Sequence, residues 1–116
     1  MNPLLVNIIA ELRGHTGRDN LISSRDLARV LELPHSHGER TVRDLLTQAL
    51  HDGTLEELEV PLCAIPGQGY FLASDITEAQ AYADWCYALA SEALRKSSAV
   101  RALFRSMGLH LQSSEK

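Results

Sequence analysis

The stretch from Ser23 to Gly53 constrains the fold of this chain more than any other. It holds two short helical patterns on either side of a polar connection, His35–Gly38. Ser23 fits an N-cap of the first helix, and Leu33 should end it because the residue before Pro34 avoids the α region. Gly53 should end the second helix. Each pattern has one apolar face, formed by Leu27, Ala28, Val30 and Leu31 in the first and by Val42, Leu45, Leu46, Ala49 and Leu50 in the second. The stretch predicts a helix-turn-helix.

The polar face of the second helix carries groups that can hydrogen-bond phosphates or base edges in a major groove. The candidates for DNA contact are Arg40, Thr41, Arg43, Asp44, Thr47 and Gln48, with Arg25 and Arg29 of the preceding helix as phosphate ligands. A solvated helical hairpin also shows a charged outer face. In that interpretation Arg29 pairs with Asp26 or Glu32, and Arg43 pairs with Glu39 or Asp44.

The positions of the charged residues are more informative about nucleic-acid binding than the net charge is. A net charge of -4 and a pI of about 5.7 are not typical of a globally basic, non-specific nucleic-acid binder. All bases before Asp44 are arginines, whereas the segment from Asp44 to Ala93 has acids but no Lys or Arg. Basic residues return at Arg95, Lys96, Arg101 and Arg105. Basic character therefore lies on the helical hairpin and near the end of the chain.

A β-hairpin is predicted directly after the helix-turn-helix. Residues 61–65 and 70–73 have strand composition, and the turn between them contains Gly67, Gln68 and Gly69. Residues 54–60 fit either an extra helical turn or the approach to a strand. Upstream, the sequence predicts a helix over 3–13, with Pro3 in its first turn, and one edge strand over 20–22.

A long helix follows. Asp75 and Glu78 have capping-box spacing, and nothing breaks the helical pattern before Gly108. A heptad-like seam runs from Ile76 to Met107, and Tyr82, Trp85 and Leu89 form a second apolar face. The partner that covers this seam could be helix 3–13 of the same chain, the same helix of a second copy, or another protein. The seam residues expected to contact a homodimer or protein partner are Ala79, Ala83, Cys86, Ala90, Ala93, Val100 and Phe104.

The sequence offers little for catalysis or metal binding. His35 and His37 form one H-x-H in a polar turn without a second matched pair. Cys63 and His51 could form a nucleophile–base pair, but Cys63 falls in a predicted strand, where a buried inert thiol is expected. We therefore predict no enzyme activity, no metal and no cofactor. No apolar run approaches ~20 residues, so we expect no membrane span and a cytoplasmic protein with reduced Cys63 and Cys86.

Three segments carry a resemblance to a known group. These are residues 15–28 (HTGRDNLISSRDLA), residues 40–45 (RTVRDL), and residues 61–64 (PLCA) continuing to 69–73 (GYFLA). The chain resembles small phage and prophage winged helix-turn-helix proteins over roughly residues 5–105. It departs from them in the acidic residues within 54–60 and in a wing turn that lacks Lys and Arg.

The resemblance implies an α+β fold, mostly α, with a short β-hairpin wing. The order of the predicted elements divides the chain into a winged helix-turn-helix domain over 1–75, a long C-terminal helix over 76–108 that packs on the domain, dimerises or does both, and a tail over 109–116. The resemblance also implies that residues 40–50 read double-stranded DNA in transcription regulation or replication. The alternative is a protein–protein interaction module on the same scaffold without DNA binding.

Overall fold

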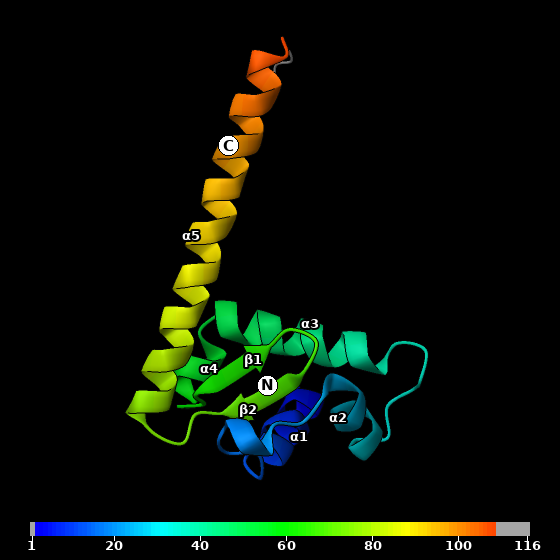
Figure 1. Cartoon of the computed structure of the whole chain (residues 1–116). Coiled ribbons are helices and arrows are strands. Elements are labelled where there is room, and N and C mark those ends of the chain that lie inside the picture. Colours follow the sequence, from blue (N-terminus) through cyan, green and yellow to red (C-terminus); the bar gives the residue numbers. More distant parts are fainter. Residues whose placement is uncertain (1, 109–116) are drawn as a thin grey trace. The chain divides into compact units, whose positions relative to one another are not determined.

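The computed structural model describes residues 2–108, so the predicted tail at 109–116 lies outside the described residues. The chain divides into two compact units, Met1–Gln80 and Ala81–Lys116. Figure 1 shows a mostly helical α+β chain with one two-stranded antiparallel hairpin and a long C-terminal helix, as predicted. The elements in chain order are α1 (Pro3–Leu12), η1 (Arg18–Asn20), α2 (Ser24–Val30), α3 (Gly38–His51), α4 (Thr54–Glu57), β1 (Leu62–Ile65), β2 (Gly69–Leu72) and α5 (Ile76–Ser106).

The core of the first unit is built from the apolar faces of its helices and from the hairpin. Ile8 and Leu12 of α1, Leu27 of α2, and Val42 and Leu46 of α3 have almost no exposed surface. The helical spacing predicted these faces correctly at their centres. The prediction that Val30 and Leu50 belong to the apolar faces was wrong. Both lie in the last turn of their helix, α2 and α3 respectively, and are more than half exposed. The core fixes which side of α3 is turned outward.

Helix α2 ends earlier than Leu33, the residue predicted from Pro34. Glu32 has a positive φ of 55°, its amide donates to the Arg29 carbonyl, and the Leu33 amide donates to the Ala28 carbonyl. This is a Schellman motif, with a glutamate at the left-handed position that glycine usually holds. Ser23 does form the predicted N-cap, since its Oγ accepts a hydrogen bond from the Asp26 amide at 3.0 Å. The two helices of the hairpin are thus separated by a longer turn than the sequence predicted.

The structure also decides the conformation of residues 54–60 and 20–22. Thr54–Glu57 forms the helical turn α4 and not a strand approach, with Leu55 buried against the core. Residues 20–22 do not form an edge strand, because Arg18–Asn20 is a 3₁₀ helix and only Ile22 pairs with the sheet.

That single pairing joins the hairpin to the chain before α2. The Ile22 amide donates to the Tyr70 carbonyl at 2.9 Å, and the Tyr70 amide donates to the Ile22 carbonyl at 2.8 Å. Gly69 makes the close approach possible, because a Cβ at this position would overlap the Ile22 carbonyl oxygen. A second link comes from Leu72, whose carbonyl accepts from the Gly17 amide and whose amide donates to the His15 carbonyl. The hairpin is therefore fixed beside the start of α2.

The start of α5 is capped as the Asp75–Glu78 spacing predicted. The Asp75 carboxylate accepts from the Glu78 amide at 2.8 Å, while the Glu78 carboxylate accepts from the Ser74 amide at 2.8 Å and the Arg18 amide at 3.1 Å. The Ser74 and Arg18 amides stabilise the charged form and hold the pKa of Glu78 below its ordinary value of 4.5. The bond to Arg18 ties the first turn of α5 to η1.

We predict that Gly69→Ala lowers the free energy of unfolding by about 2–3 kcal/mol, because the new methyl group must displace the Ile22 backbone. Chemical denaturation measures the change. Gly67→Ala is the control, since Gly67 also has a positive φ but nothing lies near its would-be Cβ; we expect a loss of only about 1 kcal/mol there. Equal losses in the two variants would contradict the close approach.

A second prediction concerns pH. Since the folded-state pKa of Glu78 is lowered, its contribution to stability is present above pH 4.5 and is lost as pH falls through the folded pKa. Glu78→Gln should therefore lower Tm at pH 7, and its difference from wild type should disappear at low pH. Glu57→Gln, in an exposed position of α4, is the control and should leave Tm almost unchanged. A Glu78→Gln deficit that persists at low pH would show that charge is not the cause.

Candidate nucleic-acid interface

The outer face of α3 carries the residues predicted to contact DNA. Arg40, Arg43, Asp44, Thr47 and Gln48 are all exposed, because Val42, Leu46 and Ala49 on the opposite face are buried. Thr41 is the exception, since it is half-buried and its Oγ1 donates to the His37 carbonyl at 2.9 Å. The structure thus presents five of the six predicted residues of this helix to solvent.

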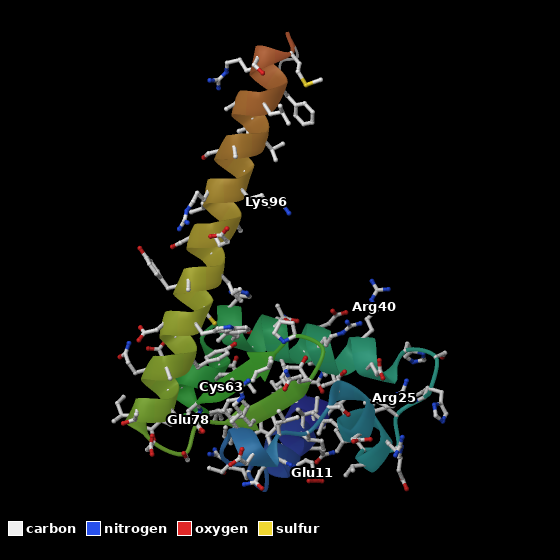
Figure 2. The ribbon with its side chains drawn as sticks, in the orientation of Figure 1. Glu11, Arg25, Arg40, Cys63, Glu78 and Lys96 are labelled. Atoms are coloured by element: carbon white, nitrogen blue, oxygen red, sulfur yellow. The ribbon has the colours of Figure 1, made fainter. Side chains whose placement is uncertain are left out.

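These residues do not share one direction. At 100° per residue, Arg40, Asp44 and Thr47 lie at the middle of the exposed face, with Arg43 at one edge and Gln48 at the other. Gln48 lines a hollow with Asn2 and Leu5 of the α1 end, away from the hairpin. Figure 2 shows Arg40 extending outward from α3. The middle of the face is therefore the part best placed to enter a groove.

A groove of about 600 Å³ separates α3 from the hairpin. It brings together Arg25 of α2, Arg43 of α3, and the hairpin turn at Gly67 and Gln68, residues that the sequence had singled out separately. Gly69 also lines it, but as the first residue of β2 and not as part of the turn. Arg29 is outside this groove and lines a neighbouring hollow with Leu33 and His35. Arg25 lines both hollows, so it is grouped with Arg43 in the first and with Arg29 in the second.

Three of the four candidate arginines make ion pairs on the surface. Arg29 lies 3.5 Å from Asp26, and Arg25 lies 3.5 Å from Glu39. Arg40 lies 3.7 Å from Asp44. Exposed pairs of this kind contribute about 0–1 kcal/mol, so each arginine can exchange its partner for a phosphate at little cost.

Arg43 forms neither of the ion pairs that the sequence suggested for it. Within residues 2–108 the acids in question are taken by other arginines: Glu39 by Arg25, and Asp44 by Arg40. Arg43 lies instead beside Tyr70, close enough that its charge favours the ionised phenol. Of the two arginines that line this groove, Arg25 pairs with a carboxylate and Arg43 forms no ion pair within residues 2–108.

Two residues of the groove were missed by sequence reasoning. Tyr70 lines it from β2, and burial raises the pKa of its phenol, so the ring is neutral near pH 7. Its position in the predicted second strand was the available signal, since alternate residues of a strand face opposite sides of the sheet. Glu39 places a negative charge in the same groove beside Arg25. It had been considered only as a partner for Arg43.

The rest of the described chain offers no competing centre. Residues 2–108 contain no cluster of His, Cys, Asp and Glu suited to a metal ion. Cys63 is buried in β1, as expected, and no disulfide joins it to Cys86. None of the helices within the described residues has both the length and the apolar character needed to cross a membrane.

The predicted partner-binding residues all lie on α5. They are Ala79, Ala83, Cys86, Ala90, Ala93, Val100 and Phe104, and none of the described residues of this helix is buried.

Comparison with protein-family models, curated proteins and solved structures gave no match to this chain.

Proposed function

We propose that the chain is a winged helix-turn-helix protein that binds double-stranded DNA. In this proposal α2 and α3 are the helix-turn-helix, α3 enters the major groove, and the β1–β2 hairpin is the wing. The resemblance of residues 15–28, 40–45 and 61–73 to small phage and prophage proteins supports a role in transcription regulation or replication.

The observation that carries the proposal is the position of Arg43. It is exposed, forms no ion pair within the described residues, and shares a groove with Arg25 and the hairpin turn. A guanidinium in this setting can bind a phosphate or the O6/N7 edge of guanine with two hydrogen bonds. Arg40 and Thr47, at the middle of the exposed face, add donors to the same surface.

Two observations favour the docking alternative. The hairpin turn has no Lys or Arg, and Glu39 brings a carboxylate into the groove. Under that alternative the exposed apolar side chains of α5 bind a protein and the arginines of α3 are only solvated. Salt separates the two cases, because phosphate binding weakens steeply with ionic strength and apolar docking does not.

We also propose that the protein is a homodimer joined through α5. Two copies of α3 would then read half-sites about one helical turn (~34 Å), or a multiple of it, apart. The support is α5 itself, which has apolar side chains along its length and none of them buried.

We expect Arg43→Ala to weaken binding to random duplex DNA by about tenfold or more, because a hydrogen bond to a charged group such as a phosphate contributes about 1.5–3 kcal/mol. It should also make log K less steep in log[salt] by about one. Fluorescence anisotropy at several salt concentrations measures both, and Tm should not change because Arg43 is exposed. Arg13→Ala, which removes an exposed arginine outside the groove, should have little effect.

Equal effects of the Arg43 and Arg13 substitutions would mean that only net charge matters. If wild-type protein shifts no duplex DNA even at low salt, the docking alternative replaces the proposal.

Ala90→Glu should convert the dimer to a monomer, because it places a charge in the centre of the proposed seam. Ala88→Glu is the matched control: it adds the same charge to another exposed alanine of α5, off the seam. Light scattering coupled to size exclusion gives the mass. An Ala90→Glu variant that keeps the dimer mass contradicts the seam, and one that unfolds shows that Ala90 faces the chain's own core.

A further inference from the structure

We propose that α5 pairs with α5 of a second copy of this chain and that the two helices run antiparallel. The proposal rests on the homodimer proposed above and specifies how its two chains meet. It is independent of whether the protein binds DNA.

Helix α5 exposes apolar side chains along its length. This helix is 31 residues long and has no buried residue. Tyr87 is 76% exposed, Leu94 70% and Leu103 55%. Helices gain most of their stability from burying an apolar face, and an exposed apolar face is typical of an interaction site. These three residues flank the Ile76–Met107 seam, so one neighbouring helix can cover them together with it.

The charges of α5 are separated along the helix. Every acid of α5 precedes every base along the helix: Glu78, Asp84 and Glu92 come before Arg95, Lys96, Arg101 and Arg105. In a parallel pair the two basic halves would lie side by side and repel each other. An antiparallel pair places the acidic half of each helix along the basic half of the other, and complementary potentials favour that orientation. Although Glu92 pairs with Arg95 of its own helix at 3.3 Å, the order of the charges favours a second copy in reversed direction as the occupant of the apolar face.

Side-chain size also changes along the seam. Large residues occupy its C-terminal part, including Val100 and Phe104, and alanines occupy its N-terminal part. If Ile76 lies opposite Met107 of the second copy, then Phe104 lies opposite Ala79, and Val100 opposite Ala83. The Phe104–Ala79 and Val100–Ala83 layers then each combine one large and one small side chain. A parallel pair would instead stack Phe104 on Phe104 and Ala79 on Ala79, which leaves crowding at one end and voids at the other.

The antiparallel register fixes the position of the Cys86 thiol relative to the second copy. It places Cys86 opposite Ser97 of the second copy, whereas the two Cys86 residues are eleven positions out of register, or about 16 Å apart. A parallel pair would bring the two Cys86 side chains together. Cys63 does not interfere, because it is buried in β1.

The experiment is disulfide cross-linking of the full-length protein under mild oxidation, without DNA, followed by non-reducing electrophoresis. We expect wild type to stay monomeric on the gel and Ser97→Cys to form a covalent dimer through Cys86 and the new thiol. Ser98→Cys is the matched control, since it adds a thiol one residue away and off the seam, and it should cross-link weakly. Mass spectrometry of the digested dimer identifies the joined peptides.

Several outcomes would overturn the proposal. A wild-type dimer linked Cys86 to Cys86 means that the helices run parallel. Equal cross-linking of Ser97→Cys and Ser98→Cys means random collision. A monomeric mass for unmodified protein in solution means that α5 packs within its own chain or binds a different protein. If the expected cross-link forms but no duplex DNA is bound in the anisotropy assay, the DNA-binding proposal fails and the antiparallel pair stands.

Discussion

The candidate interface depends on the backbone pairing between Ile22 and Tyr70. Two hydrogen bonds, at 2.9 and 2.8 Å, join residues 48 positions apart and hold the hairpin against the chain that leads into α2. Each bond adds only about 1 kcal/mol to stability, but together with Leu72 they determine where the sheet can lie. Because α3 packs on α2 through the core, the position of the hairpin relative to α3 follows. The groove that contains Arg25, Arg43 and Tyr70 is a consequence of this arrangement.

The groove combines three segments that are distant in sequence and unlike in character. The start of α2 contributes Arg25, α3 contributes Arg43 and Glu39, and the hairpin contributes Tyr70 with a turn that has no charge. Within the described residues Arg43 of α3 forms no ion pair, while Arg25 of α2 pairs with Glu39. In this part of the protein the capacity to attract a phosphate is therefore concentrated on α3.

The sequence predicted those parts of the fold that depend on local patterns. Apolar spacing located α1, α3 and α5, and the Ser23 and Asp75 caps formed as expected. The end of α2 was predicted wrongly because Glu32 takes a left-handed conformation, which a glutamate side chain gives no reason to expect. The pairing of Ile22 with Tyr70 and the pairing of Arg25 with Glu39 depend on tertiary packing, which no local pattern encodes. For the same reason, the sequence identified Arg25 and Arg43 individually but did not show that they line one groove.

The carboxylate of Glu39 has a consequence for selectivity. A negative group beside Arg25 subtracts from the attraction that any polyanion would feel, whatever its base sequence. If the groove receives a duplex, random sites are then held weakly and release quickly, while a matched site regains affinity through base contacts. Under the DNA-binding proposal, competition from the bulk of a genome would fall accordingly, and a modest absolute affinity would be enough to occupy the correct site.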